Sequence, residues 1–290
     1  MEIRKPGPSR SRRGEATYAS AFRLWSEVVG WGARTPVPRP LRPPAYRAFA
    51  RAIGANLAEA ELPLAAYATF GEFFGRRLRA GARPIDPDPA GVVAPCDGAV
   101  ASIGTVARGT LVQAKGHAYS LAELVADEPL ARALDGGSYA TIYLAPRDYH
   151  RVHAPARGRV TGCEFVPGAR WPVNPRVAGK RANLFARNER VVIRVDGGPL
   201  GPYVVVMVGA TAVGNIHVAA ADTWSRDAKQ RRLALDVPID RGDELGTFGL
   251  GSTVVVVFER GAVALAGAPG ERVRFGARIG VTRRVARGVA

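Results

Sequence analysis

Two histidines lie close together within residues 148–153, which read Asp-Tyr-His-Arg-Val-His. An imidazole can serve as a general base, a proton donor or a metal ligand near neutral pH. Successive side chains of a β-strand alternate between faces, so a strand would separate His150 from His153, whereas a turn would bring them together. Pro155 follows closely and favours a turn or the end of a strand. The spacing alone favours one packed and one solvated histidine over a paired site.

The two cysteines do not extend this pair to a metal site. Cys96 and Cys163 have no CxxC neighbour, and no further set of His, Cys, Asp or Glu has ligand spacing. Two cysteines are also too few for the disulfide framework of a small secreted protein. The sequence therefore predicts no metal centre.

A carboxylate and a hydroxyl complete the candidate chemistry. Asp97 lies in the run Ala-Pro-Cys-Asp-Gly at 94–98, where it serves either a turn or the orientation of a histidine. Ser252 follows Gly251 in the run Leu-Gly-Ser-Thr at 250–253. A serine hydroxyl can attack the unhindered glycine carbonyl before it when strain and a base assist. The ester can then eliminate to dehydroalanine and give a pyruvoyl group, although a lone Gly-Ser-Thr is a common sequence.

Strands dominate the chain from about Gly91 onward, because short Val-rich runs alternate there with Gly, Pro and Asp turns. One helix is expected within this region, at Ser120 to Leu134. The run Val254 to Phe258 is apolar throughout and predicts a central strand buried on both faces. The expected strands are Val92-Val93, Ala99 to Val106, Leu111 to Ala114, Tyr139 to Leu144, Val160 to Val166, Val191 to Val195, Tyr203 to Val208 and Val254 to Phe258.

The chain before this region is expected to be helical. Residues 1–14 are basic and polar and predict a disordered tail, and Pro36 to Pro44 predicts a break. Thr69 and Glu72 form a capping box that opens a short helix through Leu78. Two apolar stripes at helical spacing precede it, and the first fits either a core or a membrane surface. The stripes are Tyr18, Phe22, Trp25 and Val29, followed by Tyr46, Phe49, Ile53 and Leu57.

The composition indicates a polyanionic partner. Lys and Arg number 41 against 25 Asp and Glu, which gives a net charge of +16 and favours an anionic membrane or nucleic acid equally. Only four of the basic residues are lysine, so genomic base composition can explain part of the arginine excess. No signal peptide or transmembrane run is evident, which predicts a soluble or peripheral protein in the cytoplasm.

Several runs together resemble the bacterial phosphatidylserine decarboxylase family, and they occur in that family's order from about residue 70 to the end. The tail before Tyr18 is longer and more basic than the family pattern. The matching runs are Phe-Phe-Gly-Arg-Arg-Leu from 73, Gly-Ala-Arg-Pro-Ile-Asp from 81, Ala-Pro-Cys-Asp-Gly from 94, Gln-Ala-Lys-Gly-His-Ala-Tyr-Ser-Leu from 113, Leu-Ala-Pro-Arg-Asp-Tyr-His-Arg-Val-His from 144, Asn-Leu-Phe-Ala-Arg-Asn-Glu-Arg-Val from 183, Val-Gly-Ala-Thr from 208 and Phe-Gly-Leu-Gly-Ser-Thr-Val from 248.

The resemblance implies a self-cleaving enzyme that converts phosphatidylserine to phosphatidylethanolamine. The chain would cut between Gly251 and Ser252, and Ser252 would become the pyruvoyl cofactor that forms a Schiff base with the substrate. Asp97 would orient His153, which would take the hydroxyl proton of Ser252, and His150 would reprotonate the substrate carbon. The chains 1–251 and 252–290 would form a heterodimer, with a possible higher homo-oligomer, on the cytoplasmic side of the cell membrane.

These observations together predict an α+β fold. Residues 1–14 are expected to be the tail, 15–80 a helical membrane-associating segment, and 81–290 a β-dominated catalytic domain. A pyruvoyl decarboxylase of a soluble amino acid would need the same motif but no membrane segment. A non-catalytic basic protein bound to membrane or nucleic acid is a further alternative, but no RNA-binding signature, helix-turn-helix or zinc finger is evident, so no nucleic-acid partner is expected.

Overall fold

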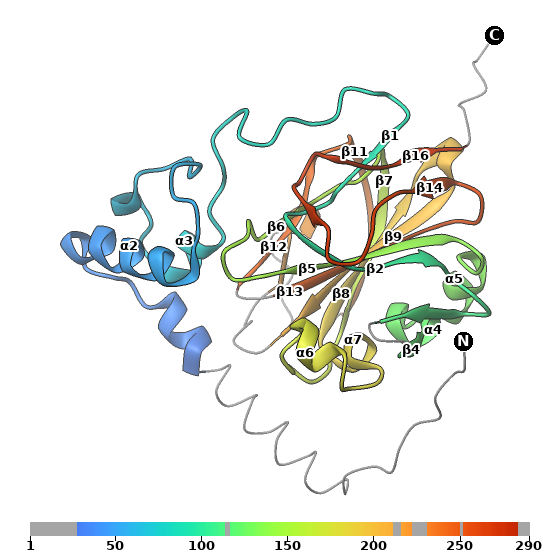
Figure 1. Cartoon of the computed structure of the whole chain (residues 1–290), viewed down its shortest axis with the longest axis horizontal. Helices are drawn as coiled ribbons and strands as arrows, with labels where there is room; N and C mark the ends of the chain where they lie inside the picture. The colour runs from blue at the N-terminus through green and yellow to red at the C-terminus, as the bar shows by residue number, and fades with distance from the viewer. Residues whose placement is uncertain (1–27, 114–116, 211–215, 222–230, 250–251, 284–290) are drawn as a thin grey trace, which may run out of the picture.

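The apolar run after Ser252 forms strand β13 (Ser252–Phe258), which lies in the middle of an eight-stranded antiparallel sheet (Figure 1). The computed structural model describes residues 28–113, 117–210, 216–221, 231–249 and 252–283. Across the sheet the strands run in the order β11 (Arg232–Ile239), β7 (Gly158–Val166), β8 (Arg190–Asp196), β9 (Pro202–Gly209), β13, β5 (Ser138–Leu144), β2 (Gly98–Thr105) and β15 (Arg272–Val273).

Three smaller antiparallel sheets accompany the large one. One contains β1 (Gly91–Val93), β16 (Arg278–Thr282) and β14 (Val263–Leu265). Another contains β10 (Ile216–Val218), β12 (Glu244–Phe248) and β6 (Arg151–His153). A hairpin joins β3 (Thr110–Val112) to β4 (Ala118–Ser120). The chain after residue 251 therefore supplies strands to two different sheets.

Strand β13 is buried along its whole length. Each of its residues has no measurable exposure, and the strand is hydrogen-bonded to β5 on one side and to β9 on the other. Full burial of a valine or phenylalanine side chain stabilises the folded state by roughly 1.5–3 kcal/mol. The prediction of a central strand buried on both faces is confirmed.

The helices are short and lie mainly outside the sheets. Residues 28–34 are helical, and α2 and α3 lie to one side of the β-sheets, where they are drawn in blue in Figure 1. The α-helices are α2 (Arg42–Ile53), α3 (Phe70–Phe74), α4 (Leu121–Val125), α5 (Glu128–Ala133), α6 (Pro175–Ala178) and α7 (Leu184–Arg187). The 3₁₀ turns are η1 (Arg39–Leu41), η2 (Leu64–Ala66), η3 (Gly198–Leu200) and η4 (Ala219–Ala221).

The helical part, from residue 28 to the end of α3, has a small apolar core of its own. Tyr46 of α2 stacks on Phe73 of α3 at 4.5 Å between ring centroids, and Tyr67 packs on the edge of the same ring. The Thr69 hydroxyl accepts a hydrogen bond from the Glu72 amide at 3.1 Å, so the predicted cap is confirmed. The second apolar stripe therefore forms core contacts.

Three details of the expected elements were wrong. The proline break is shorter than expected: residues 35–38 are not helical, but α2 begins at Arg42 and takes Pro43 and Pro44 into its first turn, where a missing N–H costs no hydrogen bond. The helix expected at Ser120 to Leu134 is two short helices, since Ala126 adopts a left-handed conformation with φ 53°. Helix α3 ends at Phe74, before Leu78.

The mixed α+β class with a β-rich body is confirmed. The tail 1–14 and most of the first apolar stripe, including Tyr18, Phe22 and Trp25, lie outside the described residues. Within the described part of the chain, no helix is long and apolar enough to span a membrane.

The burial of β13 predicts an asymmetric response to matched substitutions. Val256→Ala should lower the free energy of unfolding by about 2 kcal/mol, because it removes two fully buried methyl groups and leaves a cavity. Val281→Ala, on the exposed side of β16, should change it by less than about 0.5 kcal/mol. Urea unfolding measures both, and equal effects would contradict the central placement of β13.

Candidate active site around Ser252 and two buried histidines

Ser252 is the first residue of β13 and is held by strands on both sides. It pairs with Leu144 at the end of β5 and with Gly209 at the end of β9. Its Oγ is buried and has no hydrogen-bond partner among the described residues. A buried hydroxyl without a partner costs roughly 1–3 kcal/mol of stability. This position suits a nucleophile, because a rigid strand fixes the backbone while the oxygen stays available.

The segment that carries the histidines starts opposite Ser252. Strand β5 ends at Leu144, and the chain continues directly towards His150. The His150 carbonyl accepts a hydrogen bond from the amide of Phe248 at 3.0 Å, four residues before Ser252 in the chain. Two separate backbone contacts therefore bring the histidine segment and the chain around residue 252 together.

His150 is fully buried and holds one defined tautomer. Its Nδ1 lies 2.7 Å from the carbonyl of Asp148, which can only accept, so Nδ1 carries the proton. The ring packs on Phe74 at 4.1 Å, and Nε2 has no partner in the described part of the structure. Burial lowers the pKa of His150 to about 4. At neutral pH the site therefore contains an uncharged imidazole whose Nε2 lone pair is available.

His153 is also buried, in a different environment. Its Nδ1 donates to the Gly242 carbonyl at 2.8 Å, and its Nε2 accepts from the Tyr149 hydroxyl at 3.2 Å. The ring stacks on Phe275 with 3.6 Å between centroids. Burial lowers the pKa of His153 to about 4. The expectation of one solvated histidine was wrong, because the strand β6 and the segment before it are both covered.

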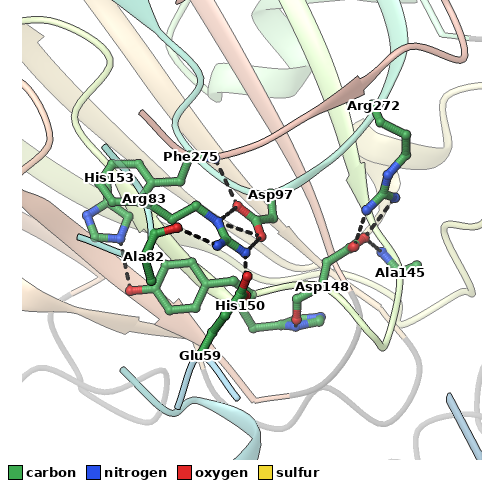
Figure 2. Close-up of polar contacts among 11 residues, drawn as sticks. Glu59, Ala82, Arg83, Asp97, Ala145, Asp148, His150, His153, Arg272 and Phe275 are labelled. Atoms are coloured by element: carbon green, nitrogen blue, oxygen red, sulfur yellow. Dashed lines mark hydrogen bonds and ion pairs between the residues drawn. The ribbon is translucent and has the colours of Figure 1, made fainter. Parts of the chain in front are cut away.

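Asp97 is bound by Arg83, which is not among the residues predicted to carry the chemistry. Figure 2 shows the Arg83 guanidinium against the carboxylate, with Nε 3.0 Å from Oδ1 and Nη2 2.6 Å from Oδ2. Arg83 also binds Glu59 at 2.9 Å. The Phe275 amide donates to Asp97 Oδ1 at 2.9 Å. Burial by itself lowers the pKa of Arg83, but its hydrogen bonds to Asp97 and Glu59 outweigh burial and raise that pKa. The hydrogen bond from Arg83 lowers the pKa of Glu59.

The structure brings Asp97 and His153 to the same neighbour without joining them. Both contact Phe275, Asp97 through the backbone amide and His153 through the ring. Their hydrogen bonds go elsewhere, to Arg83 and to Gly242 and Tyr149. In this structure the carbonyl of Gly242, not Asp97, orients the His153 ring.

The sequence did not predict a role for three further residues of the site. Arg83 lies in one of the matched runs, but its pairing with Asp97 depends on the tertiary fold. Tyr149 directly precedes His150 in the chain, and only the structure shows that its hydroxyl donates a hydrogen bond to His153 Nε2. Arg272 binds the Asp148 carboxylate, which also accepts the Ala145 amide at 2.8 Å (Figure 2). These bonds hold the turn that positions His150.

No cluster of three potential metal ligands occurs among the described residues.

Comparison with known proteins gives consistent matches. The family model described as phosphatidylserine decarboxylase matches residues 70–281. A protein of Anaeromyxobacter sp. (strain K) named phosphatidylserine decarboxylase proenzyme is 45% identical over 276 residues, which cover 91% of this chain and 97% of the relative. Proteins with the same name from Myxococcus xanthus (strain DK1622) and Herminiimonas arsenicoxydans are 42% and 46% identical, covering 88% and 84% of this chain and 93% and 79% of theirs.

The neutral histidines predict a pH-dependent stability. The unfolded chain protonates each histidine below its ordinary pKa of 6.5, whereas the folded chain does so only near 4. Between these values the unfolded state binds more protons, so stability is lost as the pH falls from 6.5 towards 4. In a Ser252→Ala background, His150→Gln should reduce the loss between pH 7 and pH 5 by about 2 kcal/mol.

Urea unfolding at both pH values measures this difference. His117→Gln serves as the control, since that side chain is half-buried and lies before β4, outside the site. An unchanged pH dependence in the His150→Gln variant would show that His150 is not held neutral.

Proposed function

The chain belongs to the phosphatidylserine decarboxylase family, and on this premise we propose that it cuts itself between Gly251 and Ser252 and then decarboxylates phosphatidylserine to phosphatidylethanolamine. The observation that carries the proposal is the place of Ser252, the first residue of a fully buried central strand with an unpartnered hydroxyl. Two neutral imidazoles lie on the segment that starts beside it.

Self-cleavage uses the Ser252 hydroxyl as the nucleophile. Oγ attacks the carbonyl carbon of Gly251, the peptide C–N bond breaks, and the amine of Ser252 takes a proton as an ester forms. Elimination then releases the Gly251 carboxylate and leaves dehydroalanine, which water converts to a pyruvoyl group with loss of ammonia. The buried, unpartnered Oγ fits this conversion, because no hydrogen bond from the described residues must be broken first.

His153 is our candidate for the base in the cleavage, with Asp97 as its partner. The contacts in the structure mean that this role requires three exchanges. The Tyr149 hydroxyl must leave Nε2, Nδ1 must exchange the Gly242 carbonyl for the Asp97 carboxylate, and that carboxylate must be released from Arg83. Their shared neighbour Phe275, which donates its amide to Asp97 and stacks its ring on His153, supports the pairing.

Once formed, the pyruvoyl group supplies an electron sink for the decarboxylation of an amine substrate. His150 supplies the proton movements. Its neutral Nε2 can take a proton from the substrate ammonium and return a proton to the α-carbon after CO₂ leaves. Its low pKa favours the return step, because a buried imidazolium gives up its proton readily.

The membrane surface is the source of the substrate in this proposal. Four of the six large apolar side chains that are exposed in the described structure lie on the helical part: Val28, Trp31, Leu41 and Leu62. The net charge of +16 favours an anionic lipid surface, where each basic residue near the headgroups contributes roughly 1 kcal/mol. The helical part is therefore the proposed membrane-contacting surface.

Variants of three residues separate maturation from turnover. Ser252→Ala should remain a single chain, and His153→Ala should be cleaved slowly or not at all. His150→Ala should still be cleaved but lose roughly 10²- to 10⁴-fold in decarboxylation rate, because it lacks the proton donor. His117→Gln should behave as wild type. Denaturing mass spectra measure cleavage, and CO₂ release from phosphatidylserine and from free serine measures turnover.

The outcomes of these variants discriminate between functions. Wild-type turnover by cleaved His150→Ala protein would remove His150 from the mechanism. Turnover of free serine but not of the lipid would favour a decarboxylase of soluble amino acids. An intact wild-type chain without activity would favour a non-catalytic role.

The membrane-contacting surface predicts a matched pair of double variants. Trp31→Ser with Leu41→Ser should weaken binding to anionic vesicles roughly 10- to 100-fold, because each removes apolar surface from the lipid interface. Val112→Ser with Val281→Ser removes exposed apolar side chains from the β-sheets and should have little effect. Vesicle sedimentation measures both, and equal losses would argue against a membrane role for the helical part.

A further inference from the structure

Arg76 is a buried cation without a carboxylate partner. It follows α3 and is only 5% exposed, yet none of the described carboxylates lies within ion-pair distance of it. Its Nη1 makes one long contact, 3.4 Å to the Phe73 carbonyl, and its guanidinium lies 5.3 Å from the centroid of the Phe73 ring. Its Nε has no hydrogen-bond partner in the described structure. An uncompensated buried charge is costly, which makes such an arginine unusual.

The two carboxylates whose charge acts on Arg76 are already paired with another arginine. Glu59 and Asp97 act on Arg76 through their charge, but both are hydrogen-bonded to Arg83. Burial lowers the pKa of Arg76, but a guanidinium remains charged at neutral pH. The positive charge is therefore available for a ligand.

Arg76 lines a cavity of about 750 Å³ to which both α3 and β12 contribute. Two other arginines of the cavity, Arg77 and Arg151, share Glu244 at 3.6 and 2.5 Å. Leu62, on the proposed membrane-contacting surface, also lines it. The volume is typical of a small-molecule site and suits the polar end of a lipid.

The cavity lies beside His150. Phe74, two residues before Arg76, packs on the His150 ring, and Thr247, which lines the cavity, precedes the residue whose amide binds the His150 carbonyl. A ligand in the cavity would therefore reach from the helical part to the candidate active site.

We propose that Arg76 binds the phosphate of a glycerophospholipid headgroup in this cavity and so positions the serine moiety at residue 252. This inference rests on the proposed function and deepens it. A guanidinium binds phosphate with two parallel hydrogen bonds. The substrate carboxylate is a poorer ligand for Arg76, because it loses its charge as CO₂ leaves and pairing would stabilise the ground state more than the transition state. The phosphate keeps its charge throughout.

Two substrates and two variants test the assignment by activity. Arg76→Gln should lower kcat/KM for short-chain phosphatidylserine roughly 10- to 100-fold, the loss expected for charge-assisted hydrogen bonds. It should leave kcat/KM for an O-acyl serine, which has no phosphate, nearly unchanged. Arg79→Gln removes the same charge from an exposed position of the same segment and should leave both substrates nearly unchanged. Equal losses of Arg76→Gln on both substrates would overturn the proposal.

Direct binding decides the question without turnover. Phosphorus NMR should show that the wild-type protein binds glycerophosphoethanolamine more tightly than inorganic phosphate. Arg76→Lys, which keeps the charge but loses the planar fork, should weaken this binding, whereas Arg79→Lys should not. Preference for inorganic phosphate, no wild-type binding, or equal binding by Arg76→Lys would overturn the assignment. If wild-type protein binds the headgroup but releases no CO₂ from phosphatidylserine, the proposed reaction fails while the phosphate site stands.

Discussion

The burial of β13 between β5 and β9 is the constraint on which the rest of the structure depends. All seven of its residues are inaccessible, and it is hydrogen-bonded along both edges. Its first residue, Ser252, is therefore placed by the sheet and not by a loop, which gives a reactive group a defined position. The same chain segment continues into β14, β15 and β16 in two sheets. A chain cut before Ser252 would remain embedded in the fold.

Burial makes an isolated charge costly, and the ionisable groups of the site respond to this cost in three different ways. Asp97 is neutralised by Arg83, and the two histidines avoid the cost of burial by staying uncharged. Arg76 stays charged and has no carboxylate partner among the described residues, so an anionic ligand would offset the cost of its burial. In the described part of the chain, the two histidines, the paired Asp97 and the unpaired Arg76 are thus separate groups with separate charges.

The pattern of apolar residues in the sequence predicted the most buried strands but not the strands that are defined mainly by pairing with a neighbouring strand. The strands β8, β9 and β13 are nearly continuous apolar runs, so their sequence identifies them. Strand β11 alternates partly buried and exposed residues, and β6 has three residues, so neither stands out without its neighbour. The candidate residues at 97, 150, 153 and 252 came from motifs, but the pairing of Asp97 with Arg83 arises only in three dimensions.

Self-cleavage before a buried central strand is tested most directly by the mass of the wild-type protein, measured first under native and then under denaturing conditions. We expect one native species that separates on denaturation into equal amounts of two chains, 1–251 and 252–290, the smaller carrying a pyruvoyl group in place of a free amino terminus. Burial of β13 explains why the two remain together until the sheet unfolds. A single full-length chain, or loss of the smaller chain under native conditions, would contradict it.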